Sequence, residues 1–286
     1  MLAFAVAVTL SVVASLSAND NVRAVQTKLR DGGFYFGEVD GAYSSQLSAA
    51  LTRYQIRNGL PITGQLDVDT SKALGAKPAV TTSPGDSAQG SDTWRRLRKG
   101  ERQTMATTNA RERSSARTTE TPGSGTGTPP QESPHGMAPI ASESTEPASA
   151  PPATAPETSS PANGRRERLR DYVGAFVLAG LDPHVGAEAD FFADRVHYYD
   201  QGVMNREKIR EDLKRYAEHW PERRFWLDGD VTVETENGNR VRVTFPLRYE
   251  LRNASKASSG KIDKTLVLEP AGDDLEIVAV NERKAD

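Results

Sequence analysis

Cysteine is absent from this sequence of 286 residues, and only four histidines occur in it. Without a thiol the chain can form no disulfide, no cysteine-ligated zinc or iron–sulfur centre and no cysteine nucleophile. The chain also lacks an excess of positive charge, because 36 basic side chains face 39 acidic ones. This balance excludes a strongly basic nucleic-acid binder. We therefore predict no metal site, no cofactor and no nucleic-acid partner.

Charged side chains are also missing from residues 2–18, most of which are apolar. A short uncharged apolar run that ends in small residues is typical of a secretory signal. Residues 14–18 are mostly small, so we predict that residues 1–18 direct export, with cleavage after Ser17 or Ala18. No lysine or arginine precedes the run, and an uncleaved inner-membrane anchor is the alternative. Either outcome predicts a periplasmic or extracellular protein.

Apolar residues make up only 36% of the chain, and the composition divides it into three parts. Residues 19–75 and 165–286 carry patterned apolar positions, whereas residues 76–164 contain 12 of the 17 prolines and many serines and threonines. Such a segment cannot bury enough apolar surface to offset the entropy of ordering, so we predict a long disordered linker. Its basic run, residues 94–99, either contacts an anionic surface or is a solvated patch.

The first patterned segment predicts three short helices, because its apolar positions recur three or four residues apart. These positions are Val22, Val25 and Leu29, then Leu47, Ala50, Leu51 and Tyr54, and last Thr70, Ala73 and Leu74. Ser44 or Ser45 is suited to cap the second helix, and Asp67 the third. Residues 19–75 are therefore predicted to form a small all-α three-helix domain.

Many positions of this segment together carry a resemblance to a known family. They are Val25, Gln26, Leu29, Gly33, Phe34, Tyr35, Gly37, Val39, Asp40, Gly41, Tyr43, Ala50, Leu51, Tyr54, Gln55, Gly59, Leu60, Gly64, Leu66, Asp67 and Thr70. In this order they resemble the peptidoglycan-binding three-helix domain of bacterial cell-wall hydrolases and envelope proteins, over residues 20–75. The resemblance implies peptidoglycan as a partner. Ser44 and Leu47 depart from the family, which often has glycine and threonine there, beside the expected groove.

Five residues of this domain are candidate peptidoglycan contacts. They are Tyr35, Asp40, Gly41, Tyr43 and Gln55. The two tyrosines are expected on loops, where their rings can stack on a sugar or a stem peptide. A structural role is the alternative, because Asp-Gly is a turn signal with or without a ligand and a glutamine amide can hold loop backbone.

The last segment, residues 165–286, predicts helices first and strands afterwards. Helical spacing covers residues 169–177, a second helix begins at Asp182-Pro183, and a third runs over residues 205–220. A short strand at residues 196–199 precedes the third helix. Alternation of period two then predicts further strands at 225–233, 241–251, 262–268 and 275–280. One polar and one apolar face imply an α+β cone, with a curved antiparallel sheet over three helices.

Two local signals refine this picture. Asn237-Gly238 is typical of a hairpin turn, and Pro246 on the polar face indicates an edge strand or a bulge. The element order, and the string from Phe192 to Gly202 that leads into the third helix, resemble the nuclear transport factor 2-like superfamily over residues 166–283. That superfamily includes SnoaL-like and ketosteroid-isomerase-like proteins. The resemblance implies a pocket, but the fold alone does not choose a function.

Five residues are expected near this pocket. They are Tyr172, His197, Tyr198, Asp200 and Trp226. An isomerase needs a carboxylate base that faces an oxyanion donor, and we could not match such a pair to the family motif. The scattered histidines carry no zinc-ligand spacing. We therefore predict no catalytic residue and no enzymatic activity.

Taken together, these features predict an exported, wall-associated protein. The first domain binds peptidoglycan, and the linker tethers a non-catalytic, pocket-bearing domain there for a small molecule or a protein partner. Two alternatives stay open. One is an envelope enzyme, isomerase-like or dehydratase-like, that the first domain localises; an unpaired carboxylate in a deep pocket would favour it. The other is a structural module that forms homodimers through its sheet; an exposed apolar sheet face would favour that one.

Overall fold

The computed structural model describes residues 20–77, 87–100, 161–236 and 238–285. The predicted export signal, residues 1–18, lies outside these ranges. Within them, no helix combines the length and the apolar character that a membrane crossing requires.

The N-terminal helices match the sequence pattern. A first helix covers residues 20–31, followed by α2 (Ser45–Arg57) and α3 (Val68–Leu74). The Ser44 hydroxyl accepts a hydrogen bond from the N–H of Leu47, and the Asp67 carboxylate caps α3 in the same way. The three helices enclose a core of their own. It is made of Val22, Val25, Leu29, Tyr35, Leu47, Ala50, Leu51, Leu66 and Leu74.

A further helix, α4 (Ser87–Lys99), lies inside the segment that the composition predicted to be a disordered linker. The linker prediction is wrong for these residues. Trp94 and Leu97 are buried, and the Trp94 indole donates a hydrogen bond to the Asp182 carboxylate at 2.9 Å. Within the basic run at 94–99, Arg98 forms an ion pair with Asp274 at 2.9 Å. Arg95, Arg96 and Lys99 are exposed, so for these three side chains the two alternatives, an anionic-surface contact and a solvated patch, both stay predictions. The predicted linker beyond α4, residues 101–160, lies outside the described residues.

The C-terminal domain begins with α6 (Pro161–Gly180), a short 3-10 helix η1 (Ala187–Phe191) and β1 (Phe192–Tyr198). A second 3-10 turn, η2 (Tyr199–Gln201), leads to β2 (Val203–Asn205) and α7 (Arg206–His219). The predicted helix at Asp182-Pro183 is thus the later and shorter η1. The remaining strands are β3 (Glu222–Leu227), β4 (Thr232–Thr235), β5 (Val241–Arg252), β6 (Ala257–Ala271) and β7 (Asp274–Lys284).

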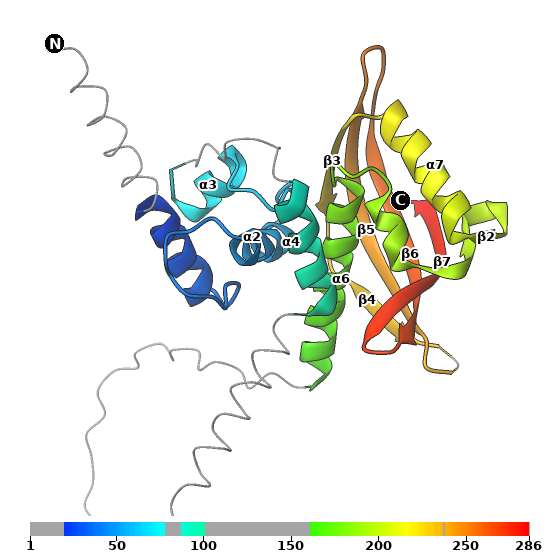
Figure 1. The fold of residues 1–286 in the computed structure, drawn as a ribbon, viewed down its shortest axis with the longest axis horizontal. Coiled ribbons are helices and arrows are strands. Elements are labelled where there is room, and N and C mark those ends of the chain that lie inside the picture. Colours follow the sequence, from blue (N-terminus) through cyan, green and yellow to red (C-terminus); the bar gives the residue numbers. More distant parts are fainter. Residues whose placement is uncertain (1–19, 78–86, 101–160, 237, 286) are drawn as a thin grey trace, which may run out of the picture.

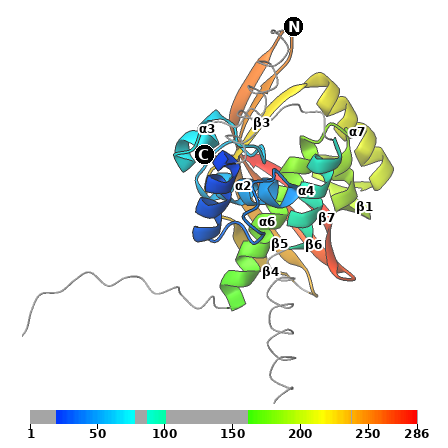
Figure 2. The ribbon, with the colours of Figure 1, turned by 60° about the vertical axis from the view of Figure 1, so that its left-hand side comes forward.

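The strands form one sheet in the order β2-β1-β7-β6-β5-β3, with β4 beside β5. Helix α6 runs between the N-terminal helices and this sheet (Figure 1), and the sheet curves around the helices that it covers (Figure 2). The prediction of an antiparallel sheet is wrong at one pair, because β1 runs parallel to β7. The sheet is therefore mixed, an open cone of the predicted kind.

Pro246 lies on β5, which is an interior strand with neighbours on both sides. Of the two predicted alternatives, the edge strand is therefore wrong, whereas an irregularity is present because the ladder on one side of β5 is interrupted at Pro246. Proline is tolerated because β3 ends at Leu227, β4 starts at Thr232, and the turn between them faces Pro246. In that turn the N–H of Asp228 donates to the carbonyl of Pro246 at 3.0 Å, and a Cβ on Gly229 would lie 2.9 Å from the proline ring.

The two domains are packed against one another. Ala49, Ile56 and Ile62 belong to the same buried cluster as the core of the C-terminal domain. At the centre of this contact, the Arg53 guanidinium meets the Asp171 carboxylate at 2.9 Å, and both side chains are at most 3% exposed. The helices approach closely because residue 174 is glycine; a Cβ there would lie 2.5 Å from Ile56 Cδ1. This shared interface contradicts two independent domains joined only by a flexible linker.

Candidate functional site

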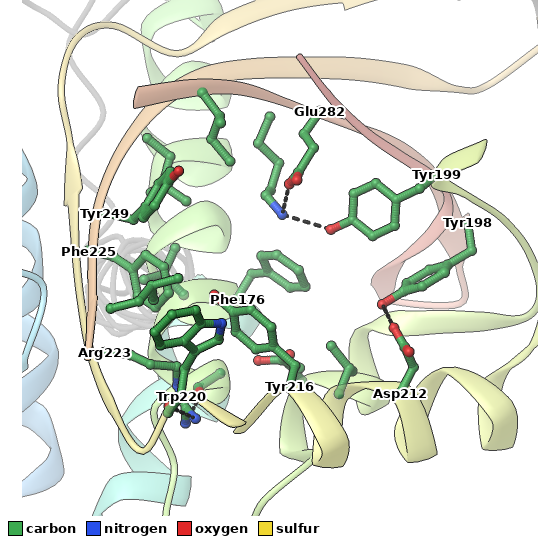
Figure 3. A pocket seen from close by; sticks show the side chains of 18 of the residues that line it. Phe176, Tyr198, Tyr199, Asp212, Tyr216, Trp220, Arg223, Phe225, Tyr249 and Glu282 are labelled. Atoms are coloured by element: carbon green, nitrogen blue, oxygen red, sulfur yellow. Dashed lines mark hydrogen bonds and ion pairs between the residues drawn. The ribbon is translucent and has the colours of Figure 1, made fainter. Parts of the chain in front are cut away.

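A cavity of about 380 Å³ in the C-terminal domain opens between α6, α7 and the concave face of the sheet (Figure 3). Its size lies in the range of small-molecule sites. Its aromatic lining consists of Phe176, Phe192, Tyr198, Tyr199, Tyr216, Trp220, Phe225 and Tyr249. Its charged lining consists of Glu188, Asp212, Arg223, Lys264 and Glu282. The cavity thus combines apolar walls with a few charged groups.

Strand alternation brings the sheet residues of this site together. Phe245 on β5 is paired with Lys264 on β6, which is paired with Glu282 on β7, so all three side chains lie on the concave face. The Lys264 ammonium is 3.0 Å from the Glu282 carboxylate and donates to the Tyr199 hydroxyl at 2.8 Å. Figure 3 shows Tyr199 and Glu282 approaching one another from η2 and β7. Burial opposes the charge of Lys264, but Tyr199 and Glu282 outweigh it and raise the pKa of the ammonium.

The backbone at the start of η2 is strained. Tyr199 has φ +49°, and among the described residues no other non-glycine side chain has a positive φ. Such conformations cost about 1–3 kcal/mol and cluster at functional sites. Here the strain places two consecutive rings, Tyr198 and Tyr199, along the same cavity, with centroids 4.7 Å apart. Tyr198 then donates its hydroxyl proton to the Asp212 carboxylate at 3.1 Å.

Glu188 differs from the other charged residues of the cavity. Within the described part of the chain its carboxylate has no hydrogen bond or ion pair, and a Cβ on Gly180 would lie 2.1 Å from its Oε2. Burial raises the pKa of this carboxyl to about 7, although the charges of Lys264 and Arg223 oppose the shift. Arg223 itself donates to the carbonyls of Trp220 and Gly180, each at 2.9 Å. Glu188 is therefore a carboxyl that gains or loses a proton near neutral pH.

Of the residues predicted for the pocket, only Tyr198 lines it. Tyr172 is 1% exposed, donates to the carbonyl of Leu275 and is not part of the cavity lining. His197 and Asp200 are exposed outside the cavity. Trp226 alternates with Phe225, so its ring lies on the opposite face of the sheet, where Arg248 stacks over it at 4.0 Å. The prediction was wrong for these four residues.

Sequence reasoning missed the charged residues of the site, but one signal was available. Lys264 occupies an inward position of the alternating run Ile262, Lys264, Leu266 and Leu268, and a charge among inward apolar residues indicates a pocket or a buried pair. Glu188 carried no such signal, because its position depends on the irregular chain between α6 and β1.

In the N-terminal domain the structure gives the two glutamines a structural role. Gln55 is fully buried; its amide donates to Thr63, Thr70 and the carbonyl of Gln65 and accepts from the N–H groups of Thr63 and Gly64. Gln26 accepts from the N–H of Gly41 and donates to Asp40, each at 2.8 Å.

The five predicted peptidoglycan contacts therefore differ in burial and in hydrogen bonding. Gln55 and Tyr35, which is 3% exposed, are buried and hydrogen-bonded, so the prediction of surface contacts is wrong for them. Gly41 is buried in a turn at φ +78°, and the Tyr43 hydroxyl bonds the loop at Gly64 and Leu66. Asp40 is exposed, and its contact with a ligand stays a prediction.

Metal-ligating side chains do not cluster in the part of the chain that the structure describes: no three His, Asp or Glu residues are close enough there to hold an ion.

The outer face of β5 and β6 carries Arg242, Thr244, Asp263 and Thr265, so it is polar.

Comparison with known proteins finds matches to the first domain. Residues 18–74 match the family described as "Putative peptidoglycan binding domain". The chain is 39% identical over 66 residues to the localization factor PodJL of Caulobacter vibrioides. This match covers 23% of this chain and 7% of that protein. The chain thus spans only a small part of this relative's length. The N-terminal domain is thus similar to this family along nearly its whole length.

Solved structures resemble the C-terminal part. One is titled a "putative calcium/calmodulin dependent protein kinase II association domain" from Xanthomonas campestris, with 15% identity, coverage of 44% of this chain and 91% of that chain, and a TM-score of 0.38. Another is titled a "putative dehydratase from the NTF2-like family" from Streptomyces avermitilis, with 14% identity, coverage of 44% and 99%, and a TM-score of 0.38. These likenesses concern the fold alone. The element order and the open, curved sheet of the C-terminal domain agree with the α+β cone that the sequence predicts.

Proposed function

We propose that this protein is exported, binds peptidoglycan through residues 20–77, and holds a ligand-binding pocket in a fixed position at the cell wall. The match of residues 18–74 to a peptidoglycan-binding family is the observation that carries the proposal. The buried Arg53–Asp171 pair and the shared apolar cluster support a fixed position. In this proposal the pocket takes up a small molecule and does not transform it.

Co-sedimentation with purified sacculi tests wall binding. The full chain is expected to pellet at low and at moderate salt, and soluble wall fragments should release it. Asp40→Ala should weaken pelleting if this exposed carboxylate contacts the wall, whereas Glu269→Ala, which alters an exposed pair on the C-terminal domain, should not. If the full chain stays in solution at both salt concentrations, wall binding is refuted.

Spin labels test the fixed position. Because the chain has no cysteine, Val68→Cys and Glu211→Cys introduce two unique labelling sites, both exposed. We expect a narrow distribution of distances between the labels, which stays unchanged when part of residues 101–160 is deleted. A broad distribution would show that the two domains move independently.

An enzyme is the second candidate function, and Glu188 favours it. A carboxyl with a pKa of about 7, in the same cavity as Tyr216 and Lys264, is suited to proton transfer at neutral pH. Deuterium incorporation next to the carbonyl of small ketones, followed by NMR, tests this activity. Loss of incorporation in Glu188→Gln would support an enzyme, and its absence in the wild type would count against one.

A further inference from the structure

The cavity already stabilises one organic cation of its own. The Lys264 ammonium lies 5.2 Å from the centroid of the Tyr199 ring and 3.0 Å from the Glu282 carboxylate. An aromatic ring and a carboxylate are the two groups that attract an ammonium ion most strongly in a partly desolvated site. This pairing satisfies the charges of Lys264 and Glu282. The carboxylate of Asp212 is likewise occupied, by the Tyr198 hydroxyl and by Arg215.

Among the charged residues that line the cavity, Glu188 has a carboxylate with neither a hydrogen bond nor an ion pair within the described residues. Arg223, whose charge acts on Glu188 together with that of Lys264, directs two of its N–H groups to backbone carbonyls. Glycine at position 180 leaves room for the carboxylate, because any larger residue would collide with Oε2. Three tyrosines lie close enough for the charge of Glu188 to act on their hydroxyl groups: Tyr198, Tyr199 and Tyr216. Glu188 thus has aromatic neighbours but no cation of its own.

We propose that the pocket binds a small organic ammonium compound, whose cationic nitrogen pairs with Glu188 and whose body lies against the aromatic walls. Phe176, Tyr216 and Trp220 supply ring surface on the same side of the cavity (Figure 3). The inference rests on the proposed role of this cavity as a ligand site. A volume of about 380 Å³ accommodates roughly a dozen non-hydrogen atoms, taking ~30 Å³ for each water-sized group.

Two other ligand classes would show the opposite pH dependence of binding affinity. A neutral ligand that accepts a hydrogen bond from protonated Glu188 would bind more tightly as the pH falls. An anionic ligand would have to recruit Lys264 or Arg223 and would also gain when Glu188 is neutral. An ammonium ligand requires the carboxylate form, so its affinity should fall about tenfold between pH 8 and pH 6, in proportion to the ionised fraction of a group with a pKa of about 7. The direction of the pH dependence therefore separates the three.

The experiment uses the full chain and three probes of equal size: phenethylammonium, 2-phenylethanol and phenylacetate. Binding is measured by calorimetry at pH 6 and pH 8. We expect phenethylammonium to bind most tightly, more tightly at pH 8 than at pH 6, and to lose at least tenfold in affinity in Glu188→Gln. Glu211→Gln, which removes an exposed carboxylate on α7, should bind as the wild type does.

Equal or tighter binding of the alcohol or of phenylacetate would overturn the proposal, and so would the absence of binding by all three probes. Co-sedimentation of Glu188→Gln with sacculi gives an independent readout, because Glu188 lies in the C-terminal domain and not in residues 20–77. Retained pelleting together with lost ammonium binding shows that the effect of the substitution is confined to the C-terminal domain. Failure of pelleting in the wild type would refute wall binding and leave the ammonium result standing.

Discussion

The buried ion pair between Arg53 and Asp171 provides the sharpest test of how the domains are arranged. Its atoms are 2.9 Å apart, and the two side chains are 2% and 3% exposed, so water does not screen the pair. Asp171→Asn keeps the size of the side chain and removes its charge. The Arg53 guanidinium then remains buried without the carboxylate that compensates it. Removing one partner of a buried pair typically costs about 3–5 kcal/mol.

The expected loss for Asp171→Asn is about 3 kcal/mol in the free energy of unfolding, at the lower end of that range because the amide oxygen still accepts a hydrogen bond. The matched control is Glu269→Gln, since Glu269 pairs with Arg240 at 3.0 Å while both side chains are more than 40% exposed. Exposed pairs contribute about 0–1 kcal/mol. Replacing both partners, as in Arg53→Met with Asp171→Leu, should recover most of the loss.

Urea denaturation followed by tryptophan fluorescence measures these differences, because all three tryptophans lie in α4 or the C-terminal domain. We expect a single transition in the wild type, since the two domains share a core. The reasoning is refuted if Asp171→Asn costs no more than Glu269→Gln, or if two separate transitions appear in the wild type. Either result would mean that the pair is hydrated in solution and that the domains are not docked.

Three further substitutions test individual contacts. Gly174→Ala should lower the free energy of unfolding by about 1–3 kcal/mol in urea denaturation, because the new Cβ overpacks the helix crossing. The control Gly164→Ala should be neutral or stabilising, because no atom lies within 4 Å of its new Cβ. Equal effects of the two substitutions would contradict the close approach of the helices. Burial raises the pKa of Glu188 from 4.5 to about 7, so the folded state prefers the proton and loses stability as the pH rises through 7. Glu188→Gln should therefore stabilise by up to about 3 kcal/mol at pH 8 and give no gain near pH 4.5, and thermal unfolding at a series of pH values would show a constant gap if the site were hydrated. Trp94→Phe leaves the buried Asp182 carboxylate with one hydrogen-bond donor fewer and should lower the free energy of unfolding by about 1–3 kcal/mol. If the variant were no more sensitive to protease than the wild type, α4 would not depend on this bond.

The sequence contained enough local information to predict most elements. A cap such as Ser44 or Asp67 acts within its own helical turn, and the alternation over 241–251 records which face of β5 is buried. Partner choice is not local. The parallel pairing of β1 with β7 joins segments more than 80 residues apart, and no pattern within Phe192–Tyr198 indicates the direction of its neighbour.

Helix α4 was missed for a related reason. Its apolar stripe amounts to Trp94 and Leu97 among arginines, which is too short for a periodicity signal and is typical of a polar segment. The helix is stable because partners from distant parts of the chain complete it: Asp182 accepts from its Trp94 and its Ser91, and Asp274 neutralises Arg98. Burial acts to raise the pKa of Asp182, but hydrogen bonds from the backbone N–H of His184, the indole N–H of Trp94 and the hydroxyl of Ser91 outweigh it and hold that pKa below its usual range.

Docking also changes what residues 101–160 can contribute. Helices α4 and α6 pack side by side (Figures 1 and 2), and Arg168 donates to the carbonyl of Lys99 at 3.2 Å, so the segment leaves and re-enters the folded body at neighbouring points. Its length therefore does not set the distance between the first domain and the pocket. An effective concentration governed by a flexible tether would fall as the tether lengthens. A docked pocket would instead keep one distance and one orientation to whatever the first domain binds, and changing the length of this segment would leave both unaltered.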